Sequence, residues 1–405
     1  MSNEINNGSK ISLGTATIIG INAMIGAGVI AIPGLLARFT GPAGILAFAF
    51  SMVVAMLIGI SLGDLAQLYP GEGWNYRYPA AWGGHFWGMV SSISYFIGVL
   101  VAMGFVAQQG GIYLHLFIPA LSAPALGGLL LVVLTLLVLA GAEISSWGQY
   151  VIVFFVLVPL LLTTVLCGLH FDARLLTPFM PFGVSSILSA APIALFSFLG
   201  FESIASLYSV VKNPTKNVAR ACVLAVCIVG VLYIAFAGSV IFSVPTIYFA
   251  GQPQKTLVEV IALSFPSYKF LGSLVMISAL FAIVGTLHSM IWSLSVLFIS
   301  LIKRMRSSCA AQLVARTAAR PQIAVLLIAA AMLLFSLTIS GELLVSMTTF
   351  FMVPSFALSI IALFFVPGRL HRGQLVRGAG ALVGSMVMFY YASLPVFEFV
   401  RSFFL

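Results

Sequence analysis

The sequence predicts an all-α integral membrane protein with about eleven transmembrane helices. Hydrophobic residues make up 61% of the chain and charged residues only 7%, whereas soluble proteins carry about a quarter charged residues. The apolar residues form runs long enough to cross a hydrocarbon core about 30 Å thick. Two of these runs contain features that should interrupt a helix: one is rich in glycine, and the other has a carboxylate at its centre.

The eleven apolar runs extend over the whole chain, so residues 1–405 are expected to form a single transmembrane domain without a soluble domain. The longest polar link, residues 244–269, is expected to hold a short surface helix. The runs are roughly residues 13–37, 43–68, 86–118, 124–141, 148–169, 186–210, 220–244, 270–302, 322–340, 343–366 and 376–397.

The basic residues predict how the chain is oriented. With the N-terminus placed in the cytoplasm, thirteen of the 18 Lys and Arg residues fall in inner segments and five in outer segments. This bias follows the positive-inside rule. It predicts a cytoplasmic N-terminus in a bacterial inner membrane and, after an odd number of spans, a C-terminus outside. The net charge of +9 therefore reflects topology, and no nucleic-acid partner is expected.

The sequence contains no pattern that predicts a metal site, a cofactor or a catalytic centre. The four cysteines have no metal-binding or redox spacing. An intramembrane enzyme would need paired catalytic groups at one depth, and Glu202 is the only carboxylate clearly at the centre of a run. We therefore expect no metal, no cofactor and no enzyme activity.

The first run should be interrupted around Gly26 and Gly28, near its middle. Glycine is a poor helix former, and unpaired backbone at membrane depth is tolerated only where it lines a cavity or is buried in protein. Transporters use such breaks to turn helix ends toward a substrate. The alternative is an intact helix that packs closely against a neighbour through its small residues.

The sixth run contains Glu202 at its centre and lies five runs after the first. Because five is odd, the two runs cross the membrane in opposite directions. This pattern predicts a five-plus-five inverted repeat with a discontinuous helix opening each half. The halves are residues 13–169 and 186–366, and residues 376–397 form an extra helix.

Three stretches resemble sequence motifs of the amino acid–polyamine–organocation superfamily of transporters. Within this superfamily, the sequence most resembles the basic amino acid/polyamine antiporter branch. The first is Ile25-Gly26-Ala27-Gly28-Val29-Ile30 with Pro33. The second is Phe198-Leu199-Gly200-Phe201-Glu202-Ser203, followed by the basic segment from Val211 to Ala221. The third is Tyr69-Pro70 through Gly73, Tyr76 and Tyr78.

The resemblance implies a substrate site at the two breaks. In the arginine/agmatine exchanger of this branch a tryptophan gates the site, and the matching position here is Phe196. An asparagine and a second tryptophan of that exchanger fall at about Met103 and Met290, so this pocket should be more apolar and pliable, which argues against arginine. The implied substrate-binding residues are Ile25, Gly26, Ala27, Gly28, Met103, Phe196, Phe198, Leu199, Gly200, Glu202 and Met290.

Glu202 has three possible roles: it could bind the substrate ammonium, carry a coupling proton, or hold the break by accepting backbone hydrogen bonds. An ionisable residue inside a membrane is a functional hypothesis by default. Glu202 and Phe196 are therefore the expected coupling and gating residues. Asp64 is expected to be an interface or loop-capping residue outside the substrate site.

The expected function is that of a secondary transporter for amino acids or related amines, working by alternating access. Some members of the superfamily have a lysine in the fifth helix that takes the place of a bound sodium ion. The fifth run here has no lysine, and this absence favours an exchanger or a proton-coupled permease. The alternative is a non-transporting sensor or accessory subunit of the same fold. The expected partners are a small substrate and the lipid bilayer. Because the chain ends soon after the eleventh run, where the family usually has a twelfth helix, both a monomer and a homodimer remain open.

Overall fold

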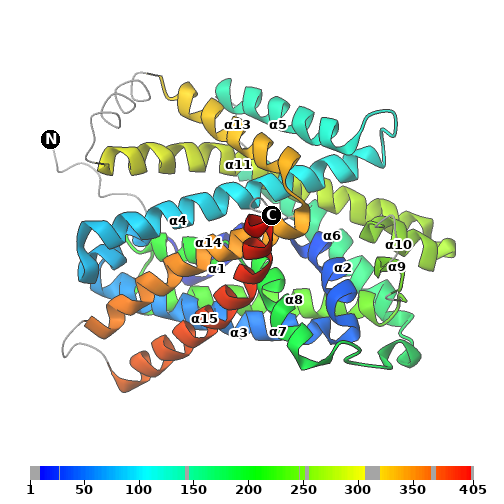
Figure 1. Cartoon of the computed structure of the whole chain (residues 1–405), viewed down its shortest axis with the longest axis horizontal. Helices are drawn as coiled ribbons and strands as arrows, with labels where there is room; N and C mark the ends of the chain where they lie inside the picture. Colours follow the sequence, from blue (N-terminus) through cyan, green and yellow to red (C-terminus); the bar gives the residue numbers. More distant parts are fainter. Residues whose placement is uncertain are drawn as a thin grey trace.

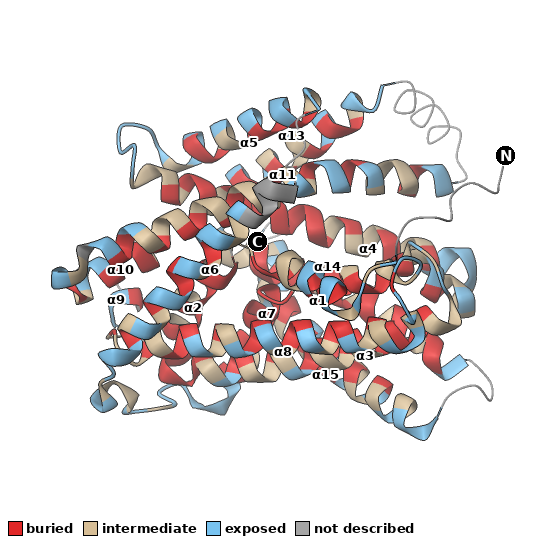
Figure 2. Ribbon diagram, turned by 180° about the vertical axis from the view of Figure 1, so that it is seen from behind, coloured by how far each residue is buried: buried red, intermediate tan, exposed pale blue. Residues whose placement is uncertain are grey.

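The computed structural model describes residues 10–26, 28–141, 146–245, 247–250, 255–305, 320–365 and 371–402. Within these ranges the chain is helical and contains no β-strand, only an isolated bridge between Ile11 and Val211. The helices form an elongated bundle (Figure 1). Helices α5, α11 and α13 lie together along one side of it, at the top of Figures 1 and 2. The prediction of an all-α protein is confirmed.

The longer elements follow the order of the predicted runs. They are α1 (Leu13–Met24), α2 (Gly28–Thr40), α3 (Gly44–Leu68), α4 (Trp74–His115), α5 (Ala123–Leu139), α6 (Ser146–Leu169), α7 (Gly183–Phe196), η3 (Phe201–Leu207), α8 (Pro214–Ile241), α11 (Lys269–Arg304), α13 (Gln322–Thr338), α14 (Gly341–Ile361) and α15 (Arg372–Arg401). The short connecting elements are η1 (Gly41–Ala43), η2 (Ala173–Leu176), α9 (Ile247–Ala250), α10 (Leu257–Ser264), η4 (Pro266–Tyr268) and η5 (Ala362–Phe365).

The lengths and compositions of the helices are those of a polytopic membrane protein. The described ranges contain seven helical segments long and apolar enough to cross a bilayer, and the pair α7 and η3 adds an eighth as one bent span. Helices α1, α5 and α13 are apolar but shorter, with 10–17 residues each. Many apolar side chains are exposed, including Leu136, Val165 and Phe397, as lipid contact requires. The count of eleven spans and the inverted repeat remain predictions.

Helix α4 begins earlier than the third apolar run predicts. The run was expected at residues 86–118, but α4 extends from Trp74 to His115 and bends at Gly84, whose φ of 72° lies outside the helical region. The predicted run did not include the first turns of α4, because Arg77 and several polar residues interrupt the apolar sequence there. Trp74 and Tyr78 are nevertheless buried, so tertiary packing supports this part of the helix.

Both predicted interruptions are present. Helix α1 ends at Met24 and α2 begins at Gly28, with Ile25 in an extended conformation (φ −77°, ψ 93°). Helix α7 ends at Phe196, and η3 begins at Phe201 in a direction that differs by 46°.

The two interruptions lie against each other. Gly200 has a left-handed φ of 114°, and a Cβ atom added there would overlap the carbonyl oxygen of Ala23, at the end of α1. A Cβ atom added to Gly28 would lie 3.2 Å from the Cα atom of Ser197, next to the end of α7. The first run is therefore interrupted, as predicted, and its small residues also make close contacts with the sixth run.

Two main-chain hydrogen bonds support the start of the first span. The Ile11 N–H donates to Val210 O (2.8 Å), and the Lys212 N–H donates to Ile11 O (2.9 Å). These bonds tie the start of α1 to the segment after η3. The link 244–269 contains the short helix α10, which begins with a capping box formed by Thr256 and Glu259. Four of its eight residues are buried, so α10 packs against the bundle instead of lying on its surface as expected.

Candidate functional site

A central cavity of about 80 Å³ lies where the two interruptions meet. Its wall comes from α1, α2, α4, α7, η3, α11 and α14. The predicted site residues that line it are Gly26, Gly28, Met103, Phe196, Leu199, Gly200, Glu202 and Met290. The resemblance alone indicated Met103 and Met290, which lie far apart in the sequence, and the fold brings both to one cavity.

Of the three other predicted residues, two are absent from this wall and one is not described by the structure. Ala27 lies outside the described residues. Ile25 is buried and is absent from the wall. The Phe198 side chain is also buried and packs against Phe48 and Tyr233, with ring centroids 6.4 Å and 5.7 Å away. The side chains of Ile25 and Phe198 therefore do not face a ligand in this cavity.

Glu202 is 4% exposed, and both of its carboxylate oxygens accept hydrogen bonds. Oε2 accepts from the Gly200 N–H at 2.8 Å, and Oε1 accepts from the Tyr95 hydroxyl at 3.1 Å. The first bond holds the interruption of the sixth span, because it gives a partner to a backbone donor that the broken helix leaves without one. Glu202 also lines the central cavity, so this structural contact coexists with access to a ligand.

Tyr95 is a site residue that the sequence did not indicate. It lines the central cavity from α4, and its ring packs edge-on against Trp74, with centroids 5.1 Å apart. It lies inside an apolar run without a surrounding motif. A tyrosine in mid-membrane usually needs a hydrogen-bond partner for its hydroxyl. This need was the one feature of the sequence that could have marked Tyr95 as a site residue.

The remaining wall of the central cavity is mainly apolar. Met24 and Met352 join the two predicted methionines, and Val99 and Val106 extend the same surface. Ser197 and Thr286 contribute the side-chain hydroxyls besides Tyr95. Methionine side chains are flexible and adapt to the shape of an apolar ligand.

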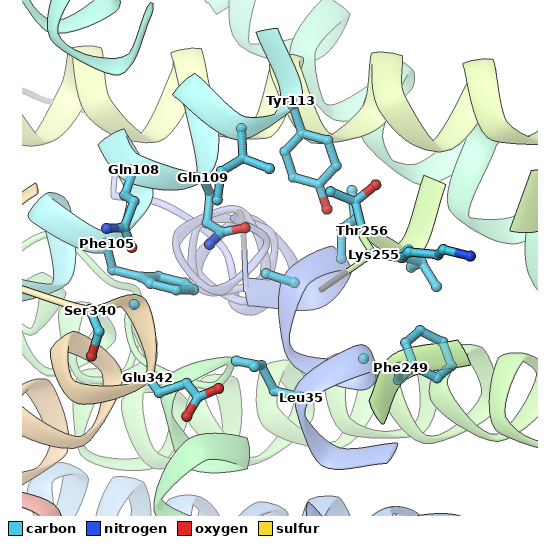
Figure 3. A pocket seen from close by; sticks show the side chains of 16 residues that line it. Leu35, Phe105, Gln108, Gln109, Tyr113, Phe249, Lys255, Thr256, Ser340 and Glu342 are labelled. Carbon is cyan, nitrogen blue, oxygen red and sulfur yellow. The ribbon is translucent and has the colours of Figure 1, made fainter. Parts of the chain in front are cut away.

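A larger cavity of about 230 Å³ lies beside the central one. It is formed by α2, α4, α9, the start of α10 and the start of α14 (Figure 3). Gln108, Gln109 and Tyr113 line it from α4, and Glu342, which pairs with Arg38, lines it from α14. The sequence analysis did not predict this cavity, because its wall is assembled from segments far apart in the chain.

An aromatic pair lies between the two cavities. Phe105 lines the larger cavity and Phe196 lines the central one. Their rings meet edge to face, with centroids 5.1 Å apart. Phe196 is the residue expected to gate the site, and Phe105 is its direct partner.

Asp64 lies away from both cavities. It is 5% exposed, and Arg377 Nη2 donates to its Oδ2 at 3.3 Å, which links α3 to α15. This placement agrees with the interface role expected for Asp64. Across the described ranges, no group of three or more His, Cys, Asp or Glu residues could hold a metal ion.

The sequence profile of a family described as amino acid permeases matches residues 11–400, which is nearly the whole chain. The chain belongs to this family. The predicted resemblance to the amino acid–polyamine–organocation superfamily is confirmed by this match.

Among its relatives, the chain is 32% identical over 236 residues to an uncharacterised transporter of Mycobacterium tuberculosis, covering 57% of the chain and 52% of that protein. It is 24% identical over 257 residues to the branched-chain amino acid permease BcaP of Bacillus subtilis (58% and 55%). It is 27% identical over 274 residues to the vacuolar cationic amino acid transporter 4 of Arabidopsis thaliana (61% and 45%). The matched region thus spans about half the length of each relative.

Proposed function

We propose that this permease is a secondary transporter that carries amino acids across the membrane by alternating access at the central cavity. The observation that carries the proposal is the meeting of two interrupted helices at a cavity lined by Glu202. Two of the relatives described above are named as a permease and a transporter of amino acids, which supports the same class of function.

The broken helices suit a zwitterion. The N-terminal turn of α2, beginning at Gly28, offers free N–H groups and the positive end of a helix dipole, which attract a carboxylate. The carbonyl groups at the ends of α1 and α7, together with Glu202, attract an ammonium group. A charged substrate would therefore exchange its hydration for contacts with both ends of the site.

The apolar wall favours an amino acid with an apolar side chain. Met103, Met290 and Met352 would surround the side chain, and no second carboxylate of the described residues lines the cavity to receive a guanidinium or a second ammonium. The name of the B. subtilis relative, a branched-chain permease, agrees with this preference. The A. thaliana relative is named for cationic substrates, so side-chain preference is the feature to measure.

Counterflow into proteoliposomes tests the proposed function. Vesicles preloaded with unlabelled leucine should transiently accumulate labelled leucine well above equilibrium, and vesicles preloaded with arginine should accumulate little. Repeating the assay with and without a proton gradient separates exchange from proton-coupled uptake. If a folded preparation gives no counterflow with any of the common amino acids, the alternative of a non-transporting sensor or accessory subunit is supported instead.

The aromatic pair between the cavities should slow the escape of a bound substrate. Phe105→Ala removes the edge-to-face contact with Phe196, and such pairs contribute about 0.5–1.5 kcal/mol beyond their buried area. We expect labelled leucine to dissociate roughly twofold to tenfold faster from the purified variant. Phe389→Ala is the matched control, because Phe389 stacks on Phe350 between α15 and α14, outside both cavity walls. Equal dissociation rates for the two variants would exclude Phe105 from the gate.

A further inference from the structure

The hydroxyl group of Ser197 is buried and has no hydrogen-bond partner among the described residues. Serine and threonine hydroxyls elsewhere in these helices commonly donate to the carbonyl four residues earlier, as Thr40 does to Leu36 (2.7 Å) and Ser295 to Ile291 (2.6 Å). Ser197 makes no such bond, although the residue is only 2% exposed. A buried hydroxyl without a partner lowers stability, so its presence calls for an explanation.

The position of this hydroxyl offers one. Ser197 lines the central cavity and directly follows the last residue of α7. A Cβ atom added to Gly28 would lie 3.3 Å from Ser197 Oγ, so the hydroxyl lies beside the first residue of α2. Helix α2 has 13 residues and begins at Gly28. The Ser197 hydroxyl, a donor without a partner among the described residues, therefore lies next to the N–H groups at the N-terminus of this helix.

A different part of the cavity wall carries the negative charge. Glu202 accepts from the Gly200 N–H, and Gly200 packs against the carbonyl oxygen of Ala23 at the end of α1. The Glu202 side of the site thus presents a carboxylate and helix carbonyls. The Ser197 side presents donors and the positive end of α2.

We propose that Ser197 is a specificity-determining residue whose hydroxyl donates a hydrogen bond to the substrate carboxylate, so that the permease selects amino acids over the amines that lack this group. The inference rests on the proposed function, because it assigns one contact at the same site. It narrows the expected substrates, amino acids or related amines, to the carboxylate-bearing class.

The proposal distinguishes between leucine and 3-methylbutylamine, which is leucine without its carboxylate. Hydrogen bonds to charged groups are among the stronger ones in proteins. Ser197→Ala should therefore weaken leucine uptake about tenfold or more, measured as the concentration for half-maximal counterflow. It should leave competition by the amine unchanged. Because the substitution removes an unbonded buried hydroxyl, the melting temperature should equal or exceed that of the wild type.

Ser203→Ala is the matched control. Ser203 Oγ is also buried without a hydrogen-bond partner in the described part of the chain, and the residue belongs to η3, but it is absent from the walls of both cavities. We expect this variant to transport leucine like the wild type. Equal effects of the two substitutions, or equal losses for leucine and the amine in Ser197→Ala, would overturn the role of Ser197.

The wild-type protein separates this inference from the proposal on which it rests. If it carries 3-methylbutylamine but not leucine, transport at the central cavity stands and selection by Ser197 is wrong. If it carries neither of these probes nor any other amino acid in counterflow, the proposed transport itself is wrong, and the assignment of Ser197 falls with it.

Discussion

Replacing Glu202 by glutamine is expected to lower amino acid transport about a hundredfold while leaving the amount of folded protein close to that of the wild type. The carboxylate lies at the wall of the central cavity, among helix ends that carry partial charges. Its loss removes the negative charge available to a substrate ammonium or a coupling proton. A hundredfold change corresponds to about 2.7 kcal/mol, within the range of about 1.5–3 kcal/mol for hydrogen bonds to charged groups.

Glutamine is an informative replacement because it can keep the structural contact. The Glu202 carboxylate accepts from the Gly200 N–H and from the Tyr95 hydroxyl. A glutamine carbonyl oxygen can still accept from Gly200, and the Tyr95 hydroxyl can rotate to accept from the amide NH₂ group. The interruption of the sixth span therefore keeps its support, and the variant isolates the role of the charge.

Transport by the Glu202→Gln variant should be measured in proteoliposomes at matched protein content, together with the melting temperature. Tyr95→Phe is a useful companion, because it removes one hydrogen bond to the carboxylate and leaves the charge in place. We expect it to reduce transport less than Glu202→Gln does. Near-normal uptake by a well-folded Glu202→Gln protein would restrict Glu202 to holding the broken helix.

The interruptions could be predicted because their causes are local. Gly26 and Gly28 disfavour a helix by themselves, and a carboxylate at the centre of a run requires partners that a regular helix does not provide. The resemblance then supplied what local sequence cannot, namely that the two interruptions share a site with Met103 and Met290.

Other features depended on packing and could not be read from the sequence. Phe198 is next to Ser197 in the chain, yet its side chain packs into the core beside Tyr233 while Ser197 lines the cavity. The backbone here forms tight turns, with Phe198 N–H donating to Leu195 O (2.9 Å) and Leu199 N–H donating to Phe196 O (3.2 Å). Such turns send successive side chains in different directions, so membership of a motif does not decide which residues reach the ligand.

A second substitution, Gly200→Ala, is expected to prevent the two interruptions from meeting and to reduce the yield of folded protein severely. The φ of 114° is a conformation that L-residues rarely adopt, and a left-handed backbone costs such a residue about 1–2 kcal/mol. The added methyl group would also overlap the carbonyl oxygen of Ala23. Because that atom belongs to the main chain of α1, the overlap cannot be relieved by rotating a side chain.

The consequences should extend from stability to function. Relieving the overlap requires moving η3 away from α1, which would separate Glu202 from the carbonyl end of α1 at the cavity. We expect a lower melting temperature, a smaller monodisperse peak in size-exclusion chromatography and no counterflow from the protein that remains.

Gly168→Ala is the matched control, because Gly168 is exposed in α6 and an added Cβ there would meet nothing within 4 Å. Replacing a helical glycine by alanine generally stabilises by about 1 kcal/mol, so the control should be at least as stable as the wild type. If Gly200→Ala folds and transports as well as this control does, the close contact between the two broken spans is not needed for binding, and the site proposed above would have to be placed elsewhere.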